Sequence, residues 1–186
     1  MRKFAIVDPD DFDRLNIYKW HASKNAGIFY ARRNLYPKRK GKPGSIPMHR
    51  QIMKAPAGFV IDHINYNGLD NRKANLRLAN HSQNVCHRRK LNKSSYSRYK
   101  GIYFNKRIRK WRAQISVNRK FKQIGYFKDE IEAAKAYDAA AKKYHGEFAS
   151  LNFAELATKR HKNHKKSKEL LITDSPGTSS ADYRDK

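Results

Sequence analysis

One long stretch of the chain is almost free of acidic residues, and this limits what it can fold into. Between Leu15 and Lys128 there are 28 Lys and Arg residues and only two acidic ones, Asp62 and Asp70. A folded body with so much positive charge repels itself unless a polyanion lies beside it. Nucleic acid is the usual polyanion, because binding releases the counterions of its phosphates. We therefore expect a nucleic-acid partner. An anionic membrane is the weaker alternative, since the sequence shows no basic amphipathic helix with a bulky apolar face.

The composition narrows the class of protein further. With 186 residues, of which 39% are hydrophobic, the chain suits one medium domain or two small ones. No stretch approaches the roughly 20 consecutive apolar residues of a membrane helix. Residues 1–7 lack the apolar segment of a secretory signal. The single cysteine, Cys86, excludes an internal disulfide and a multi-cysteine zinc module. We expect an intracellular protein in a reducing compartment, with no membrane partner.

Residues 1–47 alternate short apolar runs with turn formers and contain no catalytic pattern. Residues 4–7 and 28–31 are strand-like, and a turn signal at 24–27 precedes the second run. Residues 37–44 form a basic segment rich in Pro and Gly, which predicts a loop. We expect a small β-rich platform.

Residues 48–90 predict a strand, a long loop, a returning strand and a helix. The strand 59–61 leads into Asp62 and His63, and Asn67-Gly68 is a strong hairpin signal. Asn80 and Gln83 have the spacing of a capping box, which predicts that a helix begins there. The unit begins with a short helix that contains residues 49–53 and is ended by Pro56-Ala57-Gly58.

Residues 98–153 predict a three-stranded antiparallel sheet packed on one helix. Residues 111–117 alternate with period two, so one face is apolar and the other carries Arg112, Gln114 and Ser116. Asp129 and Glu132 have capping-box spacing, and alanines at helical spacing follow them. The helix is expected to cover the apolar face, which leaves the polar face free to bind.

Residues 91–97 and 154–186 lack apolar periodicity. The first segment is basic and contains serines, which predicts an extended linker that follows a DNA groove or is an inert tether. The second begins with a basic run and continues as a polar tail, for which we expect disorder from about residue 170.

The side chains suited to catalysis or metal binding are Asp62, His63, Asn75 and Asn84. An Asp-His pair alone is also a common structural element. Asn75 after the loop and Asn84 inside the capped helix make the constellation more specific. Alternation along the strand directs Asp62 and His63 to different partners. Three further residues are expected either to contact phosphate or to serve packing and surface roles: His49, Arg50 and Arg77.

These residues resemble the HNH nuclease motif. The likeness extends over residues 48–84 and is carried by His49-Arg50, residues 60–65, 69–72 and 75–77, and Asn84. Residues 98–153 resemble the ethylene-response-factor (APETALA-type) DNA-binding domain. The motifs that carry this second likeness are residues 99–102, 110–115, 124–127, 133–138 and 151–153. The pairing is similar to homing endonucleases of phages and mobile elements, as is the N-terminal stretch.

The resemblance implies a role for each residue of the constellation. His63 matches the general base that takes a proton from the attacking water, and Asp62 matches the first metal ligand. Asn84 matches the second ligand, at a position where many members have His. Asn75 matches the residue that braces the loop and orients His63. Oxygen ligands favour one hard divalent ion, Mg²⁺ with Mn²⁺ as the other possibility.

The second resemblance implies that the polar sheet face lies in the major groove of double-stranded DNA. Tyr103, Asn105, Gln114 and Ser116 replace the Arg or Glu that is typical there, so the target sequence of the plant proteins does not carry over. The DNA-binding residues that we expect are Lys100, Tyr103, Asn105, Arg107, Arg112, Gln114 and Ser116.

The fold class predicted from sequence is α+β, with five segments. They are a β-rich platform (1–47), a ββα-metal HNH nuclease unit (48–90), a basic linker (91–97), a sheet-and-helix DNA-binding domain (98–153) and a basic, then disordered tail (154–186). The interpretation is a metal-dependent homing-type DNA endonuclease, monomeric on DNA, without a small-molecule cofactor and, if of phage origin, in a bacterial cytoplasm. The alternatives are a sequence-specific DNA-binding regulator with an inactive HNH unit, and an RNA-binding protein.

Overall fold

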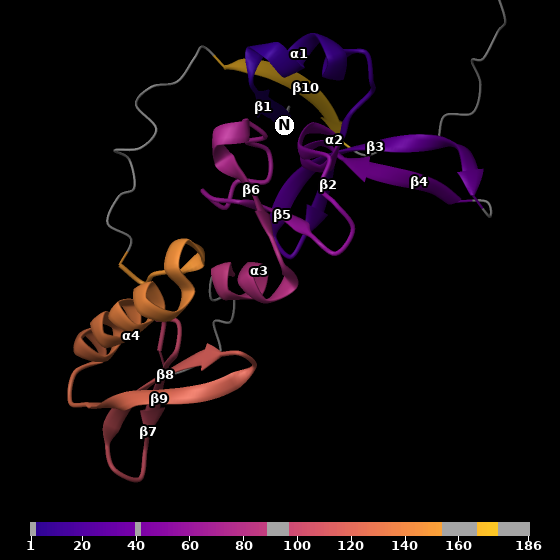
Figure 1. Ribbon diagram of the computed structural model, residues 1–186. Coiled ribbons are helices and arrows are strands. Elements are labelled where there is room, and N and C mark those ends of the chain that lie inside the picture. The colour runs from indigo at the N-terminus through magenta and orange to yellow at the C-terminus, as the bar shows by residue number, and fades with distance from the viewer. Residues whose placement is uncertain (1–2, 40–41, 89–96, 154–166, 175–186) are drawn as a thin grey trace, which may run out of the picture. The chain divides into compact units, whose positions relative to one another are not determined.

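The computed structural model describes residues 3–39, 42–88, 97–153 and 167–174 (Figure 1). These residues mix small sheets with a few helices, which agrees with the α+β expectation. The chain divides into two compact units. Unit 1 comprises Met1–Leu78 and Asn163–Lys186, and unit 2 comprises Ala79–Lys162. Unit 1 therefore contains both ends of the chain, and unit 2 is inserted into its sequence.

Unit 1 is built around a five-stranded sheet with the strand order β1-β10-β2-β3-β4. Strand β10 pairs antiparallel with β1 and parallel with β2. A separate two-stranded sheet joins β5 and β6. The elements of unit 1 are β1 (Lys3–Val7), α1 (Pro9–Asn16), β2 (His21–Asn25), β3 (Ile28–Arg39), β4 (Lys42–Pro47), α2 (Met48–Met53), β5 (Val60–His63), η1 (Lys73–Asn75), β6 (Leu76–Ala79, its last residue in unit 2) and β10 (Lys168–Asp174).

Strand β10 corrects the expectation of a disordered tail. In Figure 1 it lies beside β1, and its residues Leu170 and Ile172 are each 2% exposed. Glu169 and Leu171 are exposed, so the segment has the period-two alternation of a half-buried strand. Four residues that alternate between exposed and buried positions, after a basic run, are a weak sequence signal for a strand. The partner strand β1 is distant in the sequence, so local patterns do not reveal the pairing. The linker expected at 91–97, apart from Ser97, and residues 154–166 and 175–186 of the tail lie outside the described residues.

The platform at 1–47 differs from the expectation in two places. The Pro/Gly segment 37–44 is mostly strand, because β3 runs to Arg39 and β4 begins at Lys42, with a register shift between Leu35 and Arg39. Irregular pairing of this kind is where a strand tolerates proline. Helix α1 was not expected, although Pro9 at its first position and the acidic residues that follow are typical of a helix start.

One hydrophobic core joins the platform to the β5–β6 hairpin. Trp20 from the platform, Met48 from α2 and Ile61 from β5 belong to the same buried cluster. Strand β1 is also tied to the hairpin loop by main-chain hydrogen bonds: Ile6 donates to the carbonyl of Leu69 (2.8 Å), and Asn71 donates to that of Ile6 (2.7 Å). Residues 1–47 and 48–78 therefore form one body rather than two.

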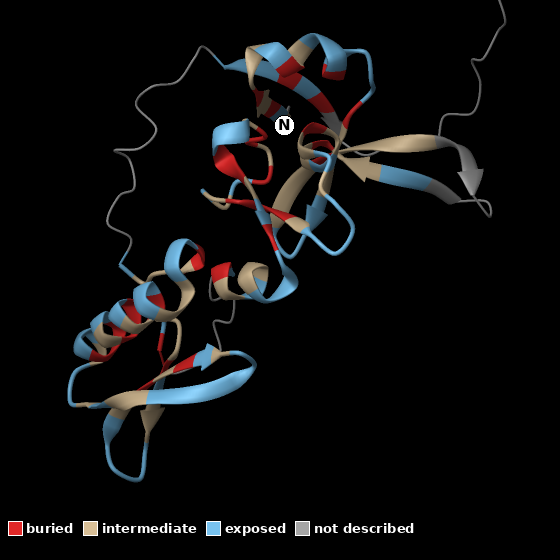
Figure 2. Ribbon diagram, viewed as in Figure 1, coloured by how far each residue is buried: buried red, intermediate tan, exposed pale blue. Residues whose placement is uncertain are grey.

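Unit 2 has the predicted sheet-and-helix arrangement, preceded by a short helix. The antiparallel sheet has the order β7-β8-β9. Figure 2 shows buried residues on α4 and β8, whereas most of β9 is exposed. Gly101 is required here: its φ is +76°, and a Cβ would lie 2.3 Å from the Tyr137 ring of α4. The elements are α3 (His81–His87), β7 (Ile102–Asn105), β8 (Lys110–Val117), β9 (Lys120–Phe127), α4 (Glu130–His145) and η2 (Gly146–Phe148).

Both helix starts predicted in this unit are confirmed. Asn80 and Gln83 form the reciprocal hydrogen bonds of a capping box at α3. Asp129 caps α4 by accepting from the main-chain N–H groups of Ile131 and Glu132. In the described part of the chain, no helix is long and apolar enough to cross a membrane.

Candidate active site

Asn75 fixes the loop that follows His63. Its side-chain oxygen accepts from the main-chain N–H of Asn65 (3.0 Å), and its side-chain nitrogen donates to the carbonyl of Asp70 (2.8 Å). Its own carbonyl accepts from Ile64 (2.9 Å), the residue directly after His63. Asn75 is 2% exposed, so these bonds are made away from water. One side chain thus determines how the backbone leaves His63.

A buried carboxylate completes the loop. Asp70 is 1% exposed, and the guanidinium of Arg72 holds both of its oxygens, with Nε at 2.7 Å and an η nitrogen at 2.6 Å. Asn65 donates a further hydrogen bond to Asp70 (2.8 Å). Burial raises the pKa of Asp70, but the hydrogen bonds and charge of Arg72 outweigh it and hold the pKa below its ordinary value. Sequence reasoning had used Asp70 and Arg72 only as part of a resemblance; their structural role was missed.

Asp62 is buried and paired with Arg77. The Nε of Arg77 lies 2.8 Å, and an η nitrogen 2.7 Å, from the same carboxylate oxygen, Oδ2. Asp62 ends up 7% exposed, so the guanidinium compensates a charge that is largely removed from water. Arg77 was expected to contact a phosphate or to be a surface residue. The structure instead places it against Asp62.

His63 lies in a cluster of three rings. Its centroid is 5.0 Å from that of His49, with the ring planes at 89°, and 5.7 Å from that of Tyr30. Tyr30 also contacts His49, at 5.9 Å. The loop can approach Tyr30 because residue 68 is a glycine; a Cβ there would lie 2.6 Å from the Tyr30 ring. Sequence reasoning missed Tyr30 and the contact between the two histidines, which a separation of 14 residues does not reveal.

The two imidazoles are buried and poorly satisfied. Among the described residues, Nε2 of His63 and Nδ1 of His49 have no hydrogen-bond partner. Burial lowers the pKa of His63 below 6.5, although the Asn71 side chain, Asp62 and Asp70 act in the opposite direction. Burial and the nearby positive groups lower the pKa of His49 to about 3. Both rings are therefore neutral at neutral pH, and His63 has a ring nitrogen available to accept a proton.

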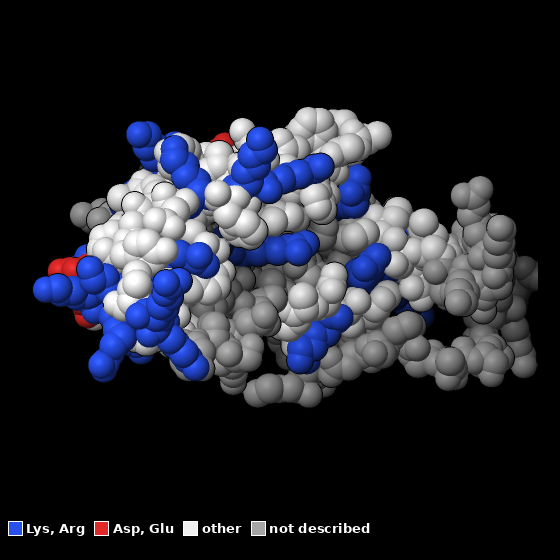
Figure 3. Space-filling view, turned by 90° about the horizontal axis from the view of Figure 1, so that it is seen from below, with Lys and Arg blue, Asp and Glu red and all other residues white. Residues whose placement is uncertain are grey.

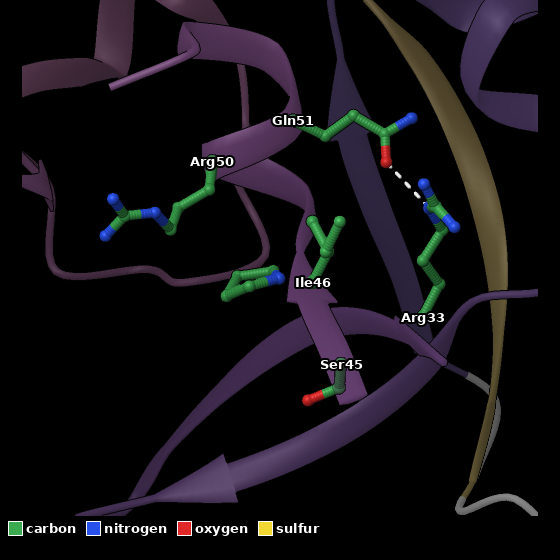
Figure 4. Close-up of a pocket in the computed structure, with 6 residues that line it drawn as sticks. Arg33, Ser45, Ile46, Arg50 and Gln51 are labelled. Atoms are coloured by element: carbon green, nitrogen blue, oxygen red, sulfur yellow. Dashed lines mark hydrogen bonds between the residues drawn. The ribbon is translucent and has the colours of Figure 1, made fainter. Parts of the chain in front are cut away.

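Arg50 follows His49 on α2 and is exposed at the rim of an open hollow of ≈ 380 Å³ (Figure 4). On the other side of that hollow, Nε of Arg33 donates to Gln51 (2.7 Å), and its guanidinium lies 4.1 Å from the centroid of Tyr18. Figure 4 shows Arg50 extending away from Arg33 and Gln51, so its charge is presented separately. The positively charged Arg50 is thus the next residue in the sequence after His49, which belongs to the ring cluster.

Asn84 lies on α3 and so belongs to unit 2, whereas Asp62, His63 and Asn75 belong to unit 1. The structure brings the latter three together at the β5–β6 hairpin. Asn84 is partly buried, and its main-chain N–H donates to the carbonyl of Asn80 (3.0 Å) in the first turn of the helix. Within the described ranges, no group of three or more His, Cys, Asp or Glu residues converges as a metal site.

The open face of the unit 2 sheet carries a row of side chains across all three strands. Arg112 pairs with Tyr103 on one side and with Tyr126 on the other, and its guanidinium lies 5.7 Å from the Tyr103 centroid. Beyond this row, Gln114 pairs with Gln123. The next pair on the same face is Ser116 with Phe121, which is 75% exposed.

Sequence reasoning missed the three residues that β9 contributes to this face. A register shift between Ala113 and Gln114 breaks the regular alternation of β9 against β8. A period-two reading of β9 therefore does not assign one face to Tyr126, Gln123 and Phe121 together.

The β7–β8 turn gathers four of the expected DNA-binding residues. Tyr103, Asn105, Arg107 and Arg112 line an open hollow of ≈ 390 Å³. Asn105 shapes the turn itself, because its side-chain oxygen accepts from the main-chain N–H of Arg107 (3.1 Å).

Figure 3 shows many Lys and Arg side chains on the face in view, with few Asp and Glu.

Lys100 is placed elsewhere. Its ammonium group donates to the main-chain carbonyls of Cys86 (2.6 Å) and Arg88 (2.7 Å), and the residue is partly buried. The expectation that Lys100 contacts DNA therefore needs correction: the group that was expected to meet a phosphate is hydrogen-bonded inside the protein.

The chain is similar to a family of HNH endonucleases and to two viral proteins. A family model described as HNH endonuclease matches residues 54–86, the segment that contains Asp62, His63, Asn75 and Asn84. A protein of Acanthamoeba polyphaga mimivirus named "Uncharacterized HNH endonuclease L560" is 31% identical over 157 residues, which cover 80% of this chain and 74% of that protein. "Protein 3.8" of Escherichia phage T7 is 31% identical over 106 residues, which cover 54% of this chain and 86% of that protein. No solved structure matches. The chain therefore belongs to the HNH endonuclease family.

Proposed function

We propose that this DNA endonuclease hydrolyses a phosphodiester of double-stranded DNA with His63 as the general base and one divalent metal ion as the cofactor. The observation that carries the proposal is the state of His63: it is 6% exposed, it follows Asp62 at the end of β5, and its Nε2 has no hydrogen-bond partner among the described residues. A buried polar atom without a partner costs free energy, and such atoms in native sites commonly have a functional role.

The proton transfer follows from the pKa of His63. Because burial lowers that pKa, the imidazole is unprotonated at neutral pH and accepts a proton at Nε2 from an attacking water. The bonds of Asn75 to the loop fix the backbone that leaves His63, so the ring is held in one orientation. In this proposal Asn75 is the brace of the loop, and it acts through His63.

The donor set fits a hard divalent ion. Asp62 offers a carboxylate, Asn84 offers an amide oxygen, and oxygen ligands suit Mg²⁺ or Mn²⁺. Asp62 binds a cation through its carboxylate oxygens, and in this structure the carboxylate forms an ion pair with Arg77. When bound, the metal stabilises negative charge on the phosphate and on the departing oxygen. His49 and Arg50 remain proposed phosphate contacts. The ring of His49 contacts that of His63, and Arg50 follows His49 on α2 with an exposed side chain, which supports this.

We further propose that the unit 2 sheet positions the enzyme on its target, in the manner of an ethylene-response-factor domain at residues 98–153. The three-stranded sheet with one helix on its apolar face supports this. The open face presents Arg112 and Gln114, which are able to bond base edges in the major groove. Tyr103, Asn105 and Arg107 lie on or beside that face, and Ser116 follows Gln114 on β8. The whole is a site-directed, homing-type nuclease that acts as a monomer.

One observation favours the alternative, a DNA-binding regulator with an inactive nuclease unit. Both nitrogen contacts from Arg77 engage the Asp62 carboxylate, so a cation at Asp62 has to share that group with an arginine. The two functions differ in whether the protein cuts DNA when a metal is supplied.

A plasmid nicking assay with Mg²⁺, Mn²⁺ or EDTA tests the proposal. The native protein is expected to nick supercoiled DNA with either metal and not with EDTA. His63→Ala is expected to slow nicking about 10²–10⁴-fold, as is usual for loss of a general base. Its DNA affinity, measured in EDTA, is expected to stay unchanged, and His81→Ala, which alters an exposed histidine, serves as the control. Undiminished nicking by His63→Ala would contradict the role of His63. Tight binding without nicking by the native protein would favour the regulator.

A further inference from the structure

The C-terminal end of α3 is fastened to the sheet of unit 2 by one lysine side chain. The last carbonyls of a helix have no partner within it, and a positive group there also meets the negative end of the helix dipole. At α3 these carbonyls include those of Cys86 and Arg88, and the Nζ of Lys100 donates to both, at 2.6 and 2.7 Å. Lys100 directly precedes the Gly101 turn that leads into β7.

The backbone of Lys100 is itself clamped. The side chain of Asn152 accepts from its N–H (2.6 Å) and donates to its carbonyl (3.2 Å). Asp138 on α4 in turn accepts from the main-chain N–H groups of Asn152 and Phe153, both at 2.8 Å. Asp138 is 7% exposed, so this clamp is anchored in the interior of the unit. A continuous chain of hydrogen bonds therefore joins α3, through Lys100 and Asn152, to α4.

The partly buried position of Lys100 makes this arrangement costly to hold. Burial lowers the pKa of Lys100 to about 8. A partly buried ammonium group would more readily extend into solvent, as surface lysines do, unless its hydrogen bonds compensated the desolvation. Helix α3 also packs against η2, so the lysine reinforces an existing contact.

We propose that Lys100 is a positioning residue, which couples the orientation of α3, and hence of Asn84, to the DNA-binding sheet. This rests on the proposed function, in which Asn84 is a metal ligand and the sheet binds DNA. Asn84 precedes Cys86 by two residues, about 3 Å along a helix axis. A change in the last turn of so short a helix therefore displaces the amide oxygen of Asn84.

The test uses the full-length variants Lys100→Met and Lys100→Arg, with Lys135→Met, an exposed lysine on α4, as the matched control. Methionine keeps the aliphatic length but cannot donate. In Lys100→Met, amide hydrogen exchange of residues 84–88 is expected to become about tenfold faster or more, because two hydrogen bonds from a charged donor are lost. Lys100→Arg, which keeps donors, is expected to restore part of the protection. Lys135→Met is expected to match the native protein.

DNA binding distinguishes this role from a phosphate contact. In EDTA, Lys100→Met is expected to keep the native affinity and the native slope of log affinity against log salt. A lost phosphate contact would instead lower that slope by about 0.9. Such a drop, with unchanged exchange at residues 84–88, would overturn the proposal.

Metal binding separates failure of the proposal from failure of the proposed function. Mn²⁺ affinity of the DNA complex, followed by electron paramagnetic resonance, is expected to weaken in both Asn84→Ala and Lys100→Met, with kcat lowered and KM for DNA unchanged in Lys100→Met. If Asn84→Ala leaves Mn²⁺ affinity intact, Asn84 is not a ligand. The positioning proposal is then refuted too, even if hydrogen exchange shows that Lys100 stabilises the end of α3. If Asn84→Ala weakens Mn²⁺ binding and Lys100→Met does not, only the positioning role is refuted.

Discussion

Replacing Asn75 by alanine tests whether one side chain holds the loop beside His63. The substitution removes two hydrogen bonds and leaves the N–H of Asn65 and the carbonyl of Asp70 without their partner. Each such loss costs about 1–3 kcal/mol when the group stays shielded from water. Asn75 is 2% exposed, but Asn65 is exposed and water replaces its lost partner at low cost. We therefore expect the free energy of unfolding of unit 1 to fall by about 2–4 kcal/mol.

The two tryptophans allow each unit to be followed separately. Trp20 is buried in the core of unit 1, and Trp111 lies on β8 of unit 2. In a Trp111→Phe background, urea unfolding monitored by fluorescence reports unit 1 alone. Asn75→Ala is expected to lower the urea midpoint of this transition and, because the loop follows His63, to reduce kcat for nicking while DNA affinity in EDTA is unchanged.

Asn67→Ala is the matched control in the same loop. Asn67 is exposed, and its side-chain oxygen accepts a single hydrogen bond, from Leu69 (3.1 Å). Its replacement is expected to cost less than about 1 kcal/mol. Equal losses for the two variants would refute the reasoning, because burial and the number of bonds would then not determine the effect.

Three further predictions concern the histidine cluster, β10 and the sheet face. The pKa of His49 is about 3 in the folded protein against an ordinary 6.5, so the unfolded chain binds an extra proton between these values and stability falls with falling pH in that window. The slope for this group approaches about 1.4 kcal/mol per pH unit, and His49→Phe is expected to flatten it in urea unfolding at pH 7, 6 and 5. Leu170→Ala is expected to cost unit 1 about 2–5 kcal/mol, and Leu171→Ala, at a neighbouring exposed position, less than about 1 kcal/mol in the same assay. Arg112→Gln is expected to weaken DNA binding in EDTA by about 1–3 kcal/mol without changing the metal dependence of nicking.

Each of these predictions has an outcome that contradicts it. An unchanged pH slope in His49→Phe would show that His49 is not held neutral. Equal effects at positions 170 and 171 would show that β10 does not pack as described. Native DNA affinity in Arg112→Gln would show that the open sheet face is not the DNA-binding surface.

Local patterns in the sequence predicted the hairpin and the helix starts. Asn67-Gly68, which signals a tight hairpin, instead lies within the long loop 64–75 between β5 and β6. The run into Asp62 and His63 and the spacing of Asn80 and Gln83 each lie within a few residues, and each formed as expected. Short-range rules succeed there because turns and caps are satisfied by neighbours in the chain.

The features that the sequence did not reveal depend on distant partners. The ring of His49 meets that of His63 only because α2 packs in the same core as β5. Lys100 looked like any other surface cation, since the carbonyls that accept its hydrogen bonds belong to a helix that ends 13 residues earlier in the chain. No propensity or period within either segment carries this information.

The position of β10 has a consequence for how the active site forms. This strand pairs with both β1 and β2, so the five-stranded sheet of unit 1 is incomplete until residues 168–174 have been made. Strand β1 in turn bonds to the loop behind His63, through Ile6 with Leu69 and Asn71. During synthesis we expect unit 2 to complete its contacts first, because they are local, whereas unit 1 needs the pairing of β10 with β1. The support of the nuclease hairpin is therefore finished only after the sheet that we propose binds DNA.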